Sequence, residues 1–136
     1  MDVQKIKQFF YDKLLEAASY YGIFPEMEGG ALPKNPKNLR LRSSFHNFKL
    51  KPVSDSRSVL TGELVAEILY EPGEPDSADF LLERILSVLS PENGAFSHEG
   101  LQILIGSISF PDQKAEGKYH RCSAVFSITV WENHES

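Results

Sequence analysis

The 136-residue sequence has one cysteine, Cys122, and no apolar run longer than three residues. A single thiol cannot form an internal disulfide, and without a cysteine cluster the chain lacks a thiolate zinc site. The short apolar runs exclude a membrane-spanning helix and the hydrophobic core of a signal peptide. We therefore expect no membrane contact and synthesis in a reducing, cytosolic setting, with Cys122 as an inert thiol in the core.

The sequence also lacks an excess of positive charge, since its formal net charge is −5. That sign argues against a general nucleic-acid-binding protein. Hydrophobic residues make up 41% of the chain and charged residues 24%, which is typical of a globular protein. The length predicts a single domain over residues 1–136.

Common catalytic motifs are missing as well. His98 and His120 have no second metal ligand at helical spacing. Successive carboxylates among Glu63, Glu67 and Glu71 lie about 13 Å apart along a strand, too far for a paired-carboxylate mechanism. We therefore predict that the protein is not an enzyme and holds no cofactor or metal. The alternative is a ligand-binding or enzymatic α+β domain whose pocket brings the two histidines and glutamates together.

Apolar periodicity predicts two helices. Apolar residues recur at steps of three and four over residues 3–20, and Asp2 can cap the start of this helix. A second apolar stripe begins after Asp76 or Ser77 and extends to about Ser90. Pro91 and Gly94 then stop the second helix.

Alternation of apolar and polar residues predicts the strands. Residues 59–70 and 119–131 form two long strands whose even-numbered side chains face the core. Residues 101–110 are apolar on both faces, which predicts a central strand that is covered on both sides. Residues 39–43 form a short strand, followed by an irregular extended stretch that Pro52 breaks.

The order helix, strand, long strand, helix, strand, strand (α-β-β-α-β-β) predicts an α+β fold. We expect an antiparallel β-sheet with both helices packed on one face. The expected core consists of apolar residues from both helices and three strands. Its members are Phe10, Leu14, Leu64, Ile68, Leu82, Ile85, Leu89, Ile103, Ile105, Phe126 and Ile128.

Charge is distributed unevenly along the chain. Residues 29–58 include seven basic residues and one acidic residue, whereas the other residues include seven basic and 18 acidic ones. Opposite patches suit self-association, because the basic patch of one copy can meet the acidic face of the next. A solvated basic loop beside an acidic helix and acidic strands is an equally good interpretation.

If the charges are functional, they form an interface between subunits. Val65 and Leu69 interrupt the acidic face of strand 59–70, and a neighbouring subunit that covers them would explain these apolar residues. The candidate interface residues are Lys37, Arg40, Arg42, Lys49, Lys51, Glu63, Val65, Glu67 and Leu69.

The second half of the chain carries a recognisable pattern. A long strand ends in Tyr70-Glu71-Pro72 and is followed by Pro75-Asp76-Ser77, the helix DFLLERILSVL, and a final strand CSAVFSITVWE. With the N-terminal helix and its Gly/Pro loop, this order resembles the tail terminator (minor tail protein U-like, tail completion) family of long-tailed bacteriophages and prophages. The resemblance covers residues 62–89 and 119–132 at the residue level, and the basic first half departs from it.

The resemblance implies a structural protein of the virion tail that is made in the host bacterial cytoplasm. Copies, commonly six, would form a ring that caps the tail tube, ends its polymerisation and prepares head joining. The implied partners are other copies, the tail tube protein and the head-completion protein, with DNA passing through the ring's channel. An interface that joins two different surfaces closes into a ring when its rotation closes. A head-completion or neck connector protein is the alternative.

Overall fold

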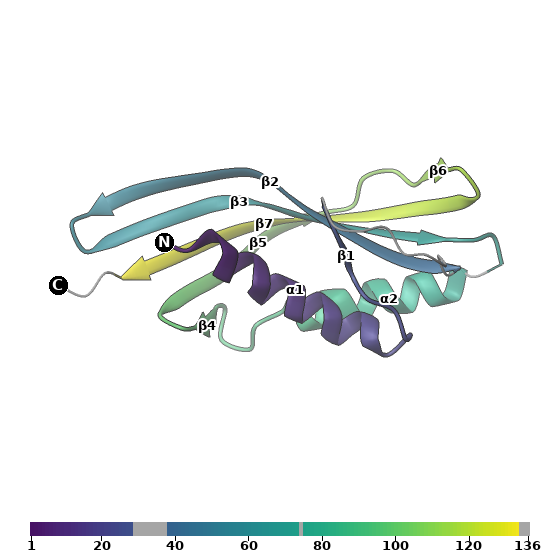
Figure 1. Cartoon of the computed structure of the whole chain (residues 1–136), viewed down its shortest axis with the longest axis horizontal. Helices are drawn as coiled ribbons and strands as arrows, with labels where there is room; N and C mark the ends of the chain where they lie inside the picture. Colours follow the sequence, from purple (N-terminus) through teal and green to yellow (C-terminus); the bar gives the residue numbers. More distant parts are fainter. Residues whose placement is uncertain (29–37, 74, 134–136) are drawn as a thin grey trace.

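In the computed structural model, which describes residues 1–28, 38–73 and 75–133, two helices lie on one face of a twisted sheet (Figure 1). The strand order among these residues is β1-β2-β3-β7-β5-β4, and β6 pairs separately with β7. In chain order, the elements are α1 (Val3–Ser19), β1 (Glu26–Met27), β2 (Leu39–Ser54), β3 (Arg57–Tyr70), α2 (Pro75–Val88), β4 (Phe96–His98), β5 (Leu101–Ser109), β6 (Lys114–Glu116) and β7 (Tyr119–Asn133).

The α+β class is confirmed, but the sheet differs from the predicted one. Strands β2, β3, β7 and β5 pair antiparallel, whereas β1 runs parallel to β2. The residue pattern does not predict β1, β4 or β6, so the expected order of elements is incomplete. Each of these strands has only two or three residues, which is too short for an alternating pattern.

Local interactions hold helix α1 at both ends. The Asp2 carboxylate accepts hydrogen bonds from the backbone N–H groups of Gln4 and Lys5, which caps the helix. At the other end, Gly22 adopts a positive φ of 68°, and the N–H of Ile23 donates to the carbonyl of Ala18. This left-handed stop turns the chain back toward the sheet.

The core lies between the helices and the even-numbered face of β3 and β7. Most of the expected core residues are buried, as predicted: Phe10, Leu14, Leu64, Ile68, Ile85, Leu89, Ile103, Phe126 and Ile128. Two expectations were wrong, because Leu82 and Ile105 are only half-buried. In α2 the buried row is Leu81, Ile85 and Leu89 at four-residue steps, which leaves Leu82 at the margin of the helix's buried face.

Strand β2 is much longer than expected. It continues from Leu39 to Ser54 because a bulge between His46 and Lys49 absorbs the irregular stretch, with Asn47 at a φ of 57°. Pro52 is tolerated because, beyond the short pairing with β1, β2 has β3 as its only described neighbour. The β2–β3 hairpin therefore extends to the far end of the molecule (Figure 1).

The expectation for residues 101–110 was also wrong, because β5 is not a central strand. Strands β3 and β7 lie in the middle of the sheet, and β5 lies between β7 and the short β4. Residues 106–109 are exposed. Neither described helix is long and apolar enough to cross a membrane.

Candidate functional site

The face of the sheet away from the helices carries most of the candidate interface residues. In the β2–β3 register, Arg40 is opposite Leu69 and Arg42 is opposite Glu67. Directly opposed residues in an antiparallel pair share a face, so these basic and acidic side chains come together within one chain. The charge pattern along the chain instead predicts that the two charges meet between copies.

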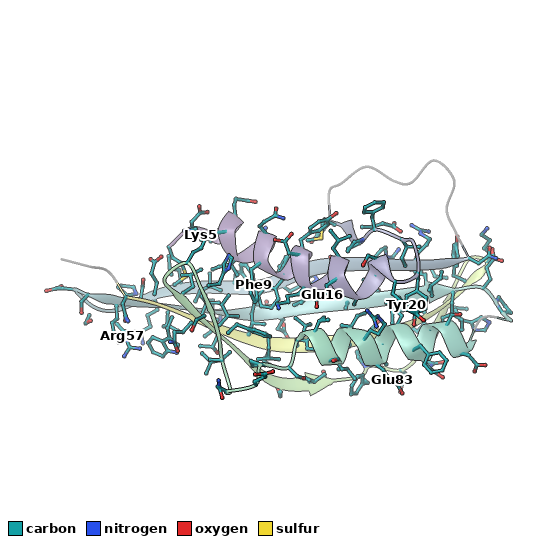
Figure 2. The ribbon with its side chains drawn as sticks, turned by 90° about the horizontal axis from the view of Figure 1, so that it is seen from below. Lys5, Phe9, Glu16, Tyr20, Arg57 and Glu83 are labelled. Carbon is teal, nitrogen blue, oxygen red and sulfur yellow. The ribbon has the colours of Figure 1, made fainter. Side chains whose placement is uncertain are left out.

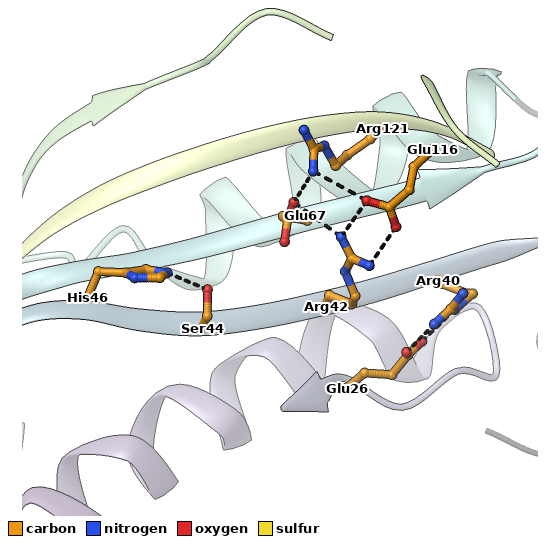
Figure 3. Close-up of polar contacts among 8 residues, drawn as sticks. All are labelled: Glu26, Arg40, Arg42, Ser44, His46, Glu67, Glu116 and Arg121. Carbon is orange, nitrogen blue, oxygen red and sulfur yellow. Dashed lines mark hydrogen bonds and ion pairs between the residues drawn. The ribbon is translucent and has the colours of Figure 1, made fainter. Parts of the chain in front are cut away.

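Four charged residues on this face form an ion-pair cluster, made of Arg42, Glu67, Glu116 and Arg121 (Figure 3). The Arg42 guanidinium lies 2.6 Å from a Glu116 carboxylate oxygen and 3.4 Å from a Glu67 oxygen. Arg121 lies 3.2 Å from Glu67 and 3.4 Å from Glu116. The cluster ties β2, β3, β6 and β7 together, although their residues are far apart in sequence.

Charge and hydrogen bonding shift the protonation of this cluster. The hydrogen bond from Arg42 lowers the pKa of the Glu116 carboxyl, and the positive charges of Arg42 and Arg121 act in the same direction. The same hydrogen bond raises the pKa of Arg42. Glu116 is 41% exposed, so solvent weakens these interactions and the cluster contributes modestly to stability.

A second ion pair holds β1 against the sheet. Arg40 donates from Nε and Nη2 to the two carboxylate oxygens of Glu26, at 2.9 and 2.5 Å (Figure 3). Such a two-pronged contact fixes the orientation of both side chains. The Arg40 guanidinium also lies 5.3 Å from the ring centre of Tyr119 on β7, so the side chain reaches across β3.

This arrangement corrects the reasoning that placed Leu69 at a subunit interface. Leu69 is fully buried within the chain, between its register partners Arg40 and Arg121, and needs no neighbouring subunit to cover it. Val65 is half-buried on the same face. Lys37 lies outside the described residues.

The far end of the β2–β3 hairpin has a different character. Lys49 and Lys51 are exposed and form no ion pair with any described residue, and the guanidinium of exposed Arg57 lies 4.5 Å from the ring centre of Trp131. Leu50 and Val53 are about half exposed. We call this group, Lys49, Leu50, Lys51, Val53 and Arg57, the hairpin end. Glu63 lies nearer the bulge and accepts a hydrogen bond from Asn47 at 2.6 Å.

The histidines do not converge on a common pocket. His98 is on β4 and is opposite Leu101, which is in turn opposite Glu132 of β7. Because His120 is twelve residues from Glu132 along the same strand, the two histidines are separated by about 40 Å. The ring of His120 stacks on Tyr70. No group of three or more potential metal ligands occurs among the described residues.

Cys122 is buried, as predicted, and this burial raises the pKa of its thiol. A thiol that resists ionisation is a poor nucleophile.

The sequence analysis missed an exposed aromatic surface where the two helices meet. Tyr20 is 72% exposed and Phe80 is 57% exposed, and both line a shallow hollow with Tyr21 and Arg84. We call these four residues the aromatic patch. The helical phase of α2 could have revealed Phe80, because it lies outside the buried row of Leu81, Ile85 and Leu89.

No protein-family model matches the sequence, and no curated protein matches it either. The fold is nevertheless similar to solved structures. One, of a protein whose name describes no activity, aligns over 100% of this chain and 98% of its own length, with 15% identity and a TM-score of 0.65. Another belongs to the virion of a native gene transfer agent particle and aligns over 90% of this chain and 91% of its own, with 14% identity and a TM-score of 0.56. These likenesses establish a shared fold.

Proposed function

We propose that this chain is a structural subunit of a phage-like particle. In the finer form of the proposal, copies of the chain form a ring, commonly of six, that caps the tail tube and ends its polymerisation. The ring then prepares the tail for joining to the head. Its partners are other copies, the tail tube protein and the head-completion protein.

The similarity to a chain of a gene transfer agent virion is the observation that carries this proposal. The alignment covers 90% of this chain and 91% of the other, so it includes the whole architecture and not one common motif. A shared fold alone does not define a function. Here it agrees with the tail terminator resemblance of the strand–turn–helix and of the final strand, which is an independent feature of the sequence.

The shape of the surface also favours assembly over catalysis. The two histidines that an enzymatic pocket would bring together lie far apart, and Cys122 is buried. The exposed apolar groups include Tyr20 and Phe80 on the helices and Leu50 and Val53 on β2, each with charged residues nearby in sequence. We therefore propose a non-catalytic role without a cofactor.

The direct experiment is to mix the purified protein with tail tubes from its own particle and to image them by electron microscopy. The proposal expects tubes of uniform length, each closed by a ring of this chain. Tubes that grow freely with no added density would contradict it. A ring that binds isolated head portals and leaves tubes open would instead favour the neck connector alternative.

DNA is the remaining proposed contact of the ring, through its channel. If the hairpin end faces DNA instead of a neighbouring copy, DNA binding should weaken steeply as salt concentration rises, in proportion to the number of phosphates contacted. Binding of the Lys49→Ala/Lys51→Ala variant should show a smaller salt dependence in the same fluorescence anisotropy assay. An unchanged dependence would remove these lysines from the DNA contact.

A further inference from the structure

Two exposed apolar surfaces of this chain lie far apart along the length of the molecule (Figure 2). Figure 2 shows Arg57 of the hairpin end at one extremity, with Tyr20 and Glu83 toward the other. Exposed groups of this size on a soluble protein commonly mark an interaction site. Since both surfaces belong to the same chain, the question is whether they fit each other.

The aromatic patch is held in place before any partner binds. The Arg84 guanidinium lies 4.7 Å from the ring centre of Tyr20, and its Nε donates to the carbonyl of Ala17 at 3.3 Å. The rings of Tyr20 and Tyr21 pack edge to face, with their centres 5.1 Å apart. Because these contacts restrict the rings, little side-chain entropy remains to be lost when a partner covers them.

Acidic residues border the aromatic patch. On α2, Asp76 precedes Phe80 by four residues and Glu83 follows it by three, and on α1, Glu16 precedes Tyr20 by four. Residues at these spacings share a helix face, so the carboxylates flank the exposed rings. Glu16, Asp76 and Glu83 are all exposed.

The hairpin end has the complementary composition. Leu50 is 52% exposed and Val53 is 51% exposed, and the neighbouring Lys49, Lys51 and Arg57 are basic and exposed. The β2–β3 register places Leu50 opposite Leu60 on the helix-side face, and Lys49 and Lys51 on the other face, so the hairpin end has an apolar side and a basic side. In composition, this apolar and basic end matches an aromatic hollow with an acidic rim. Such complementarity favours correct association and opposes contact between like surfaces.

We propose that the hairpin end of one copy docks on the aromatic patch of the next copy. Leu50 and Val53 cover Tyr20 and Phe80, while the long side chains of Lys49 and Lys51, on the other face of the strand, reach around the outer edge of β2 to Glu83 and its acidic neighbours. The contact joins two different surfaces, so repeated copies form a closed ring or an open filament according to the rotation between them. This inference rests on the proposed ring function and names the contact between its subunits.

Charge reversal tests the complementarity. Lys49→Glu/Lys51→Glu should raise the dissociation constant between copies at least tenfold in sedimentation velocity at low salt, and Asp76→Lys/Glu83→Lys should do the same. An equimolar mixture of the two variants should associate, because the reversed hairpin of one then meets the reversed patch of the other. Lys114→Glu, an exposed lysine on β6, is the control and should associate like the unchanged protein. Circular dichroism checks that every variant is folded.

Disulfide trapping locates the contact directly. When Leu50→Cys and Phe80→Cys variants are mixed under mild oxidation, cross-linked pairs should form between the two, whereas neither variant alone should cross-link above the unchanged protein. The mixture is tested both in solution and on tail tubes. Absence of the cross-link in both settings would overturn the proposed contact.

The two proposals can fail separately. Capped tubes without the Leu50–Phe80 cross-link would leave the ring function intact and reject this contact. Cross-linked copies that leave tubes uncapped would retain the contact and reject the tail-capping function. A protein that stays monomeric, alone and on tubes, would reject the contact.

Discussion

The two halves of β2 carry the same sign of charge and use it differently. In the first half, Arg40 and Arg42 bind carboxylates of β1, β3 and β6 in the same chain. In the second half, Lys49 and Lys51 are exposed and have no ion pair with a described residue. The basic segment is therefore part of the fold at one end and an available surface at the other.

The bulge at Asn47 marks the boundary between these halves. Before it, β2 pairs with both β1 and β3, and after it β2 pairs with β3 alone among the described strands. Phe48 packs against Gly62 of β3 at this point. A charged residue in a sequence therefore indicates a binding surface only if it has no ion-pair partner within its own chain.

The largest loss of stability should come from a substitution in the core, because both halves of β2 belong to the sheet that covers it. Phe126→Ala removes a fully buried ring and should lower the free energy of unfolding by about 3–5 kcal/mol. Urea unfolding followed by fluorescence measures this change. A loss below about 1 kcal/mol would contradict the burial of this side chain and the assignment of the core face.

A substitution at Gly62 tests the packing beside the bulge. A Cβ atom added there would overlap the Phe48 ring, so Gly62→Ala should cost about 1–3 kcal/mol by overpacking. Gly106→Ala is the matched control, because its nearest neighbour would be 3.5 Å away, an ordinary contact. Thermal unfolding of both variants should separate them, and equal losses would argue against the close approach at the bulge.

The paired half of β2 should matter more to stability than the free half. Arg42→Ala leaves Glu67 and Glu116 without one of their partners and, because solvent screens this partly exposed cluster, should cost about 0.5–1 kcal/mol. Lys51→Ala should change the unfolding free energy by less than about 0.5 kcal/mol. Urea titrations compare the unfolding free energies of the two variants. Equal losses would contradict the claim that only the first half of β2 contributes ion pairs to the fold.

The smallest effect is a pH dependence that belongs to the paired half. Because the folded pKa of Glu116 lies below its ordinary value of 4.5, its contribution is fully present above that pH and is lost as pH falls through the folded pKa. Glu116→Gln should therefore be less stable than the unchanged protein at pH 7, and the gap should narrow by pH 3. A gap that stays constant or widens would contradict this sign. Lys51→Gln, which removes no carboxylate, is the control.

The sequence alone predicts the parts of the fold that follow a local period. Alternation in β3 and β7 and the helical phase of α1 correctly place Leu64, Phe126 and Phe10 in the core. The length of β2 is not predictable in this way, because its pairing with β3 continues through an irregular stretch. A bulge disrupts the period of two that sequence analysis relies on.

The candidate site was less predictable for a related reason. The partners of Arg42 are Glu67 and Glu116, which are distant in sequence and come together only through the order of the strands. The exposure of Tyr20 likewise depends on how the end of α1 packs beside α2. Lys49 and Lys51 are exposed, and their role in an interface stays a prediction.

Hydrogen exchange along β2 tests most directly the claim that its two halves have different roles. Exchange is measured by mass spectrometry on the isolated subunit and on the subunit assembled on tail tubes. The account predicts slow exchange over residues 39–46 in both states, and faster exchange over residues 49–54 that slows on assembly. Equal protection along the whole strand in the isolated subunit, or no change at residues 49–54 on assembly, would contradict it.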